Sequence, residues 1–415
     1  MAILDFFRQK QSEPEAVSRP NASAGQLFTS LTDPDLLSFV RGESASGAYV
    51  TASSSLQNMA LLRCVTLISE SIGMLPLNVI VRGDAKDYAT THPLYDVLKS
   101  TPNNWQTAYE FKSQMQMSVM LHGNAYARIF RGVRGIVRIV PIPFNMMKVE
   151  MNDAWEMVYT YTRKDGGQII LPPAEVLHLR DLSEDGIVGL SRVKLAREAI
   201  GIALQAERAA ARLFKNGVLA GGALSAPNKL SDAAYTRLQE SIEAKSGADQ
   251  AHKWMILEEG LKAEKYVNTA SDSQHIENRN HQIEEVARAF GVPRPLLMMD
   301  DTSWGSGIEA LGVFFVQYAL QHWFTVWEQA IERAALTPAE RKTHYVKFNE
   351  RALLRGTLKD QSEFFTKALG AGGHSPWMSP NEVRDLQDLS KSTDANADSM
   401  QSALMRNTNV TPATP

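Results

Sequence analysis

Three carboxylates in the C-terminal half are the first residues whose types and spacing could do chemistry. Asp300 and Asp301 are adjacent in a loop rich in Gly and Ser, and Glu309 follows shortly after. Clustered carboxylate oxygens suit hard cations such as Mg²⁺, which supports phosphoryl chemistry. A metal-dependent phosphoesterase or nuclease using these three residues is therefore an alternative function. The competing interpretation is that two aspartates in a Gly-flanked loop initiate a turn or face water.

Other enzyme motifs are broken or missing. The segment Gly189–Val193 begins like a nucleophile elbow, but Val193 stands where the second Gly must allow the sharp turn, so Ser191 is expected to cap a helix instead. No Gly-rich loop ends in Lys-Ser or Lys-Thr, and the nine histidines lack paired ligand spacing. His322 is expected in the core. These motifs therefore predict no P-loop nucleotide hydrolysis, no serine hydrolase and no histidine metal site.

Composition and charge describe an ordinary globular protein. The 415 residues are 44% hydrophobic and 21% charged, which excludes a disordered or fibrous chain. A formal net charge of -3 gives no global attraction to DNA or to an anionic membrane. The single cysteine, Cys64, excludes internal disulfides and is expected to be a small core residue.

One segment has the length of a membrane span. Residues 310–327 contain no Asp, Glu, Lys or Arg, which is near the lower limit for a transmembrane helix. Polar Gln317 and Gln321 interrupt the segment, and Glu rather than Lys or Arg stands at both ends, so a helix buried in protein is the better interpretation. A membrane-associated pore remains a third hypothesis. The first eight residues lack the pattern of a signal peptide, so no secretion is expected.

The elements that must position these residues divide at about residue 190. The first half has α+β character: the periodicity predicts a helix through Leu61–Ile72, a helix over 108–122, strands over 125–130 and 137–140, and a hairpin joining 155–161 to 169–171.

The second half is mainly helical. Its pattern predicts a long basic helix (191–215), a small insert with a hairpin (253–257 with 261–267), a helix (273–290), a Gly/Ser/Asp loop (299–307), a very apolar helix (308–336), a short strand (345–348) and two helices (358–369 and after Pro380). The apolar helix would span about 43 Å and needs neighbours on several sides.

Several local strings, in order and with matching spacing, resemble the portal proteins of tailed bacteriophages, specifically the HK97-like portal family. The strings are Leu62–Leu77, His92–Leu98, Pro102–Phe111, Leu121–Tyr126, Gly189–Ser191, Ala287–Pro293, Leu353–Gly356 and Pro380–Arg384. Near Ser306–Leu311 the chain departs from its relatives, which commonly have Asn before the Ile and Gln after the Glu.

The resemblance implies a homo-dodecameric ring at one capsid vertex, through which double-stranded DNA is packaged and ejected without sequence specificity. It also implies docking of the large terminase and a head-tail adaptor, contact with major capsid protein and scaffold, and no membrane partner. The chain itself would be no enzyme, with no catalytic residue, no cofactor and no metal site, because the packaging ATPase would reside in the terminase. The protein is expected in the virion, or in a gene transfer agent particle, after assembly in the bacterial host cytoplasm.

The resemblance also implies a portal fold with an α/β wing, a helical stem, a small α+β clip, a long tunnel-lining helix and a helical crown. By analogy the regions are a flexible N-terminal arm (1–53), wing (54–190), first stem helix (191–217), clip (218–270), second stem helix (271–297), tunnel loop (298–307), long helix (308–344), crown (345–390) and flexible C-terminal tail (391–415).

Candidate DNA-facing residues lie in two of these regions. The tunnel-loop candidates are Asp301, Thr302, Ser303, Trp304 and Ser306. The stem candidates are Lys194, Arg197 and Arg208, whose charges a ring would repeat as belts around the channel. The alternative for the stem cations is ordinary solvation or salt bridging between subunits with Glu284 and Glu285.

Overall fold

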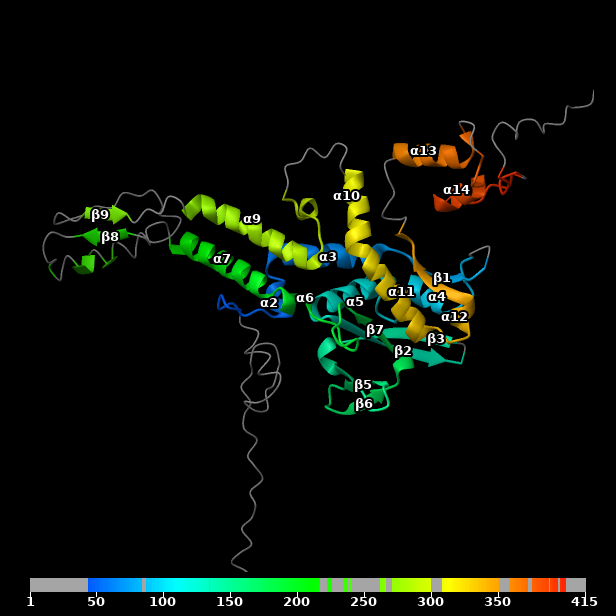
Figure 1. Cartoon of the computed structure of the whole chain (residues 1–415), viewed down its shortest axis with the longest axis horizontal. Coiled ribbons are helices and arrows are strands. Elements are labelled where there is room, and N and C mark those ends of the chain that lie inside the picture. Colours follow the sequence, from blue (N-terminus) through cyan, green and yellow to red (C-terminus); the bar gives the residue numbers. More distant parts are fainter. Residues whose placement is uncertain are drawn as a thin grey trace, which may run out of the picture.

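The structure, a computed structural model, describes residues 44–83, 87–133, 135–216, 222–225, 231, 235–237, 239–240, 262–265, 271–299, 308–350, 358–371, 375–387, 389–394 and 396–400. Helices and antiparallel sheets are both prominent, which confirms the α+β class (Figure 1). A body of sheets and helices lies to one side, and two helices extend away from it.

The first helices form one layer of this body. They are α2 (Ala52–Ser55), α3 (Met59–Met74), α4 (Pro93–Lys99) and α5 (Ala108–His122). The predicted apolar face of α3 is buried, and burial raises the pKa of the Cys64 thiol to about 12, so this cysteine is an unreactive core residue. The boundaries of α5 follow from its caps. Thr107 and Glu110 form a capping box, and Gly123 ends the helix in the left-handed conformation.

Two three-stranded sheets follow. In the first, β2 (Asn124–Gly132) lies between β3 (Gly135–Ile142) and β7 (Val176–Arg180). In the second, β5 (Met157–Thr162) lies between β4 (Met147–Met151) and β6 (Gln168–Leu171), which confirms the predicted hairpin. Short 3₁₀ turns, Phe144–Met146 and Pro173–Glu175, connect the two sheets.

The extended part consists of two helices side by side, α7 (Arg197–Asn216) and α9 (Ser271–Phe290) (Figure 1). A single helix from residue 191 was predicted, but α6 (Arg192–Leu195) is separate, because Ala196 leaves the helical conformation at ψ 13° and its N–H is shared between two carbonyls. The strand expected near 261–267 exists as β9 (Lys262–Lys265), and it pairs with β8 (Gly222–Ser225). The predicted partner, 253–257, lies outside the described residues.

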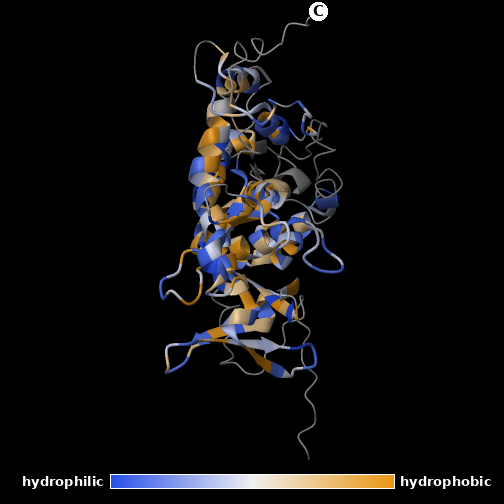
Figure 2. Ribbon diagram, turned by 90° about the vertical axis from the view of Figure 1, so that its right-hand side faces the viewer, coloured by the Kyte–Doolittle hydropathy of each residue, from blue (hydrophilic) through white to orange (hydrophobic). Residues whose placement is uncertain are grey.

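The long apolar helix is present as three consecutive helical segments. These are α10 (Ile308–Phe315), a π-helical turn (Val316–Leu320) and α11 (Gln321–Ala335). α11 buries Trp323, Phe324 and Trp327 completely or nearly so. α10 is hydrophobic along its length (Figure 2), yet Phe314 is 47% exposed. Within the described part of the chain, no helix has the length and apolar character needed to cross a membrane.

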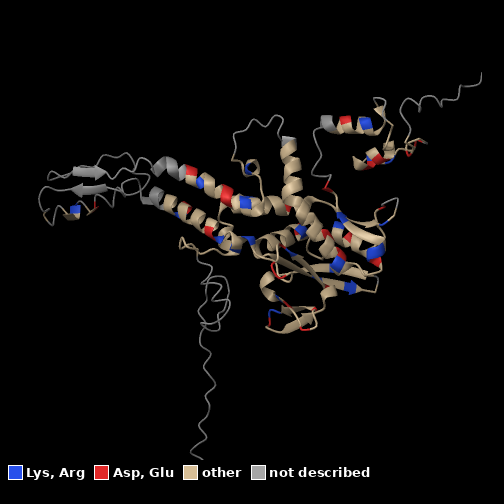
Figure 3. Cartoon of the chain, viewed as in Figure 1, with Lys and Arg blue, Asp and Glu red and all other residues tan. Residues whose placement is uncertain are grey.

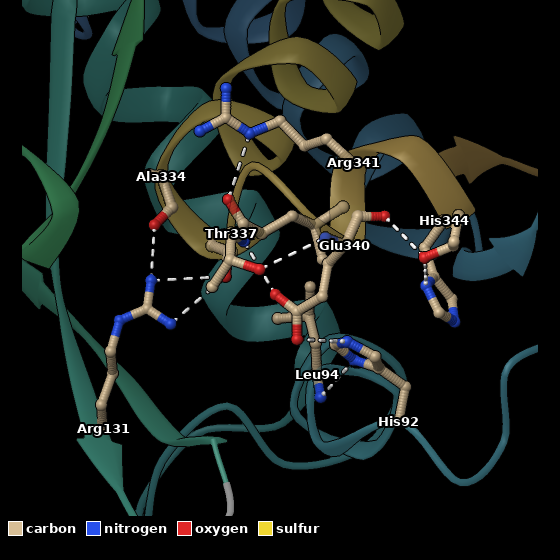
Figure 4. A network of polar contacts seen from close by, with 11 residues as sticks. His92, Leu94, Arg131, Ala334, Thr337, Glu340, Arg341 and His344 are labelled. Atoms are coloured by element: carbon tan, nitrogen blue, oxygen red, sulfur yellow. Dashed lines mark hydrogen bonds and ion pairs between the residues drawn. The ribbon is translucent and has the colours of Figure 1, made fainter.

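A network of polar contacts holds the end of α11 (Figure 4). Arg131, from β2, donates to the carbonyl oxygens of Ala334 at 2.8 Å and Ala335 at 3.3 Å. After the helix ends, the Thr337 N–H donates to the Glu340 carboxylate at 2.7 Å, and His92 lies 3.4 Å from that carboxylate. The free carbonyls at the helix end are thereby satisfied, and α11 is fixed to the first sheet.

The chain then returns to the first half of the sequence. After α12 (Glu340–Thr343), strand β10 (His344–Phe348) pairs with β1 (Leu77–Val81). This strand begins the region predicted as the crown, but its partner belongs to the predicted wing. Helices α13 (Leu358–Ala368) and α14 (Pro380–Leu386) follow, close to the expected positions.

Order extends further at both ends than the sequence predicted. The arm was expected to be flexible to residue 53, but Ala48 and Val50 are buried in the core, and the Ala45 N–H donates to Glu198 at 2.8 Å. The tail was expected to be flexible from 391, but Ala397 is buried against α14 and accepts a hydrogen bond from the Asn381 N–H at 2.9 Å. The predicted boundaries differ from the structure here because short, polar segments without periodicity can still be held by a few specific contacts. The rest of the predicted arm (1–43) and tail (401–415) lies outside the described residues.

Candidate functional site

The predicted tunnel loop lies outside the described residues, so the structure assigns no geometry to Asp301, Thr302, Ser303, Trp304 and Ser306. The same holds for Asp300, whereas Glu309 belongs to the first turn of α10. In the ranges that the structure describes, no three His, Cys, Asp or Glu residues lie close enough together to hold a metal ion. The phosphoesterase alternative depends on Asp300 and Asp301 in this loop, and it remains a hypothesis.

The predicted stem cations lie on α6 and α7. Lys194 and Arg208 are exposed, and Arg197 is partly buried with its Nε 3.2 Å from Glu198. On α9, Glu284 and Glu285 make ion pairs within the same chain, to Arg288 and Arg294. Charged positions therefore follow both helices of the extended pair (Figure 3).

A buried ion pair fastens the extended helices to the body. The Arg192 guanidinium donates to both carboxylate oxygens of Asp181, at 2.6 and 3.0 Å. Only 19% of the Arg192 side chain and 4% of the Asp181 side chain are exposed. The same guanidinium donates to the carbonyl of Ala289 in the last turn of α9, at 3.3 Å, and lies 5.1 Å from the centre of the Trp323 ring. One side chain thus joins α6, the end of β7, α9 and α11.

His322 belongs to this junction and not to the core. The prediction of a core histidine was wrong, since the residue is exposed at the start of α11, with its Nε2 3.3 Å from an Arg192 nitrogen. Desolvation of the ring, followed by the nearby Arg192 charge, lowers the pKa of His322 to about 4, while Asp181 acts in the opposite direction. His322 is therefore neutral at pH 7 and accepts a hydrogen bond from Arg192.

The loop that precedes α6 lies directly against the end of α5. The side-chain amide of Asn124 accepts from the Gly189 N–H at 2.8 Å and donates to the Gly189 carbonyl at 2.9 Å. A Cβ atom at Gly189 would lie 2.1 Å from the carbonyl oxygen of Gly123, so no other residue fits. Ser191 caps α6 as predicted, with its Oγ accepting from the Lys194 N–H at 3.2 Å.

Sequence reasoning missed this junction. Arg192 counted only as one positive charge of a basic helix, and Asp181 was not singled out. Only a weak sequence signal indicates this ion pair. The helix cap at Ser191 fixes the position of Arg192 at the start of the helix, but the sequence does not show which side chain Arg192 contacts.

Comparison with known proteins identifies the family to which this chain belongs. Residues 59–388 match the family model described as phage portal protein. The chain belongs to the phage portal protein family. It is 31% identical to the probable portal protein of Streptomyces phage phiC31 over 359 residues, 83% of this chain and 77% of that protein. It is 32% identical to the portal protein of Enterobacteria phage HK97 over 342 residues, 80% of this chain and 79% of that one.

Solved structures of the portal family share the fold. A chain from the neck of an empty gene transfer agent particle has a TM-score of 0.57 at 22% identity, covering 85% of this chain and 99% of its own length. The crystal structure of an HK97-family phage portal protein from Corynebacterium diphtheriae has a TM-score of 0.55 at 21% identity, covering 75% of this chain and 99% of that one. The predicted resemblance is thereby confirmed.

Proposed function

We propose that twelve copies of this chain form a ring at one vertex of a phage or gene transfer agent particle, and that double-stranded DNA enters and leaves through its central channel. The observation that carries the proposal is the family match over residues 59–388. The large terminase and the head-tail adaptor dock on the ring, and the major capsid protein and scaffold surround it. The protein is then a virion component assembled in the host cytoplasm.

The exposed surface of α10 and of the π-helical turn after it supports assembly with further copies. Val313, Phe314 and Tyr318 are 50%, 47% and 63% exposed, and the rings of Phe314 and Tyr318 lie 4.5 Å apart. An aromatic pair of this size on an apolar helix is costly to leave in water, and covering it stabilises an assembly. Neighbouring copies in a ring would supply that cover.

A channel for DNA of any sequence needs weak, repeated contacts. Base-edge recognition would favour particular sequences, and strong phosphate binding would stall the strand. We propose that the loop residues Asp301, Thr302, Ser303, Trp304 and Ser306 face the DNA. Lys194 on α6 and Arg197 and Arg208 on α7 are the further candidates, and contact between subunits is the alternative role for these cations. The protein itself performs no catalysis in this scheme, because the terminase supplies ATP hydrolysis.

Ring formation is the first expected result. Native mass spectrometry of the purified full chain, with class averages of negatively stained particles, should give an assembly of about twelve subunits with a central hole that admits duplex DNA. A monomer at all concentrations and salt conditions would contradict the ring. A monomer with Mg²⁺-dependent nuclease activity that is lost in Asp301→Asn would establish the phosphoesterase alternative instead.

The loop assignment predicts a defect in packaging without a defect in assembly. Trp304→Ala should lower the amount of DNA packaged per particle several-fold, because a belt of side-chain contacts around the duplex is lost, while ring mass stays unchanged. The matched control is Trp155→Ala, which removes an 83% exposed tryptophan from the turn between β4 and β5. Normal packaging by Trp304→Ala would remove this residue from the DNA-facing set.

A further inference from the structure

The α7–α9 pair has a defined inner side. A cavity of about 50 Å³ lies between the two helices and the start of α3. Its lining residues on the two helices are Ala203, Ala206, Glu207 and Ala210 from α7, and Arg279, Gln282 and Ile283 from α9. These residues lie on the sides of α7 and α9 that face each other. The angular position of any other residue around each helix can be measured from them.

Arg197 and Arg208 lie on the side of α7 that faces away from α9. At 100° per residue, both positions are about 120–180° around the helix from the alanines that line the cavity, and about 80–100° from Glu207. Arg208 is exposed. Glu198, the acid that pairs with Arg197, also accepts the hydrogen bond from Ala45. The outer flank of α7, defined by Arg197 and Arg208, is thus basic.

Glu277 and Glu284 occupy the corresponding side of α9. They are seven residues apart, and at 100° per residue they lie about 100–160° around the helix from the cavity-lining residues. Glu285 is adjacent, and the groups facing these acids are Arg288, 3.6 Å from Glu284, with Arg294 and His281. Glu277 is exposed, one turn or more away from these cations. The outer flank of α9 is defined by Glu277 and Glu284. Glu284 is paired with cations of its own chain, so Glu277 is the exposed acid that this flank presents.

Opposite charges on opposite flanks fit one occupant, a second copy of this chain. In a cyclic assembly every contact is heterologous, so one flank of each copy meets the other flank of the next. Complementary flanks steer and orient such a contact, whereas like charges in the reversed arrangement oppose it. A DNA strand would complement the basic flank only, and it would leave the acidic flank unexplained.

We propose that the basic flank of α7 contacts the acidic flank of α9 in the neighbouring copy, with Arg208 and Glu277 as its central pair. The proposal rests on the ring proposed above and adds the surfaces by which the copies recognise each other. It also assigns Arg197 and Arg208 to a contact between subunits in place of the channel wall.

Charge reversal tests the pairing. Arg208→Glu and Glu277→Arg should each raise the subunit concentration needed for half assembly about tenfold, measured by native mass spectrometry and sedimentation at low salt. The double variant Arg208→Glu/Glu277→Arg should restore assembly toward the wild-type concentration, because the attraction is re-formed with exchanged signs. The matched control is Arg163→Glu, which reverses a 53% exposed charge in the turn between β5 and β6.

The outcomes separate this contact from the ring itself. Wild-type rings with unaffected single variants would overturn the contact and leave the ring intact. Weakened assembly without rescue in the double variant would show that Glu277 is not the partner of Arg208. Normal assembly with reduced DNA packaging in Arg208→Glu would return this residue to the channel wall. A wild-type chain that never assembles would overturn the ring and the contact together.

Discussion

Replacing Arg192 by Met is expected to lower the free energy of unfolding by about 3–5 kcal/mol, because Asp181 would remain buried without its cation. Only 4% of the Asp181 side chain is exposed, and Arg192 supplies two hydrogen bonds to its carboxylate. Met preserves most of the packing over Trp323, so the loss reports on the ion pair. Urea unfolding of the full chain, followed by tryptophan fluorescence at pH 7, measures it.

Two companion variants keep this prediction falsifiable. Arg192→Lys retains the charge without the bidentate geometry and should fall between the wild type and Arg192→Met. Asp181→Asn/Arg192→Met should recover part of the loss, because no unpaired charge remains buried. Arg192→Met with wild-type stability would mean that water replaces the cation and that the junction contributes little.

The titration of His322 gives an independent readout of the same junction. Desolvation of the ring by the neighbouring groups and the Arg192 charge hold its pKa at about 4, and the Asp181 charge partly opposes them. The His322 pKa should therefore rise in Arg192→Met and fall in Asp181→Asn, as measured from the imidazole resonances by NMR. A shift in the same direction in both variants would contradict the arrangement of charges.

Local structure was predictable where the signal lies within one segment. The helix predicted over 108–122 matches α5, because Thr107 and Glu110 cap its start and Gly123 its end. The hairpin of β5 and β6 was predictable from alternation and its Gly-containing turn. The break at Ala196 was not, because the helical pattern of polar and apolar residues continues through it.

Contacts between distant segments could not be predicted from the sequence. Arg192 meets His322 across 130 positions, and β1 pairs with β10 from the far end of the chain. Periodicity placed His322 in an apolar run, but it does not tell which side of α11 faces the Asp181–Arg192 pair. The family resemblance supplied the arrangement of regions, yet the residues that hold those regions together became visible only in the structure.

A buried histidine, His178, joins the two three-stranded sheets. His178, on β7, has its Nε2 3.0 Å from the Asn124 side-chain oxygen and its Nδ1 3.3 Å from the Tyr159 hydroxyl on β5. Its backbone carbonyl accepts from Arg333 at 3.2 Å. Desolvation, followed by the charges of Arg180 and Arg333, lowers the pKa of His178 to about 2.

Acid is therefore expected to destabilise this portal-family chain through His178. Below the ordinary histidine pKa of about 6.5, the unfolded chain binds a proton that the folded state does not bind, so stability present above that pH is lost as the pH falls. The cost from this one residue is about 2 kcal/mol at pH 5. His178→Gln should lose correspondingly less stability between pH 7.5 and pH 5, as measured by urea unfolding at each pH.

The prediction concerns the change in the free energy of unfolding between pH 7.5 and pH 5, and not the free energy of unfolding at either pH alone. Gln at position 178 can still bond one neighbour, but it is smaller than the ring, so His178→Gln is expected to be less stable than the wild type at pH 7.5. The matched control is His281→Gln, which replaces an exposed histidine on α9 and should leave the slope unchanged. Burial also lowers the pKa of His92, His122 and His322, so some acid sensitivity must persist in His178→Gln. An unchanged slope in His178→Gln would mean that His178 binds its proton in the folded state too, and that water reaches the space between the two sheets.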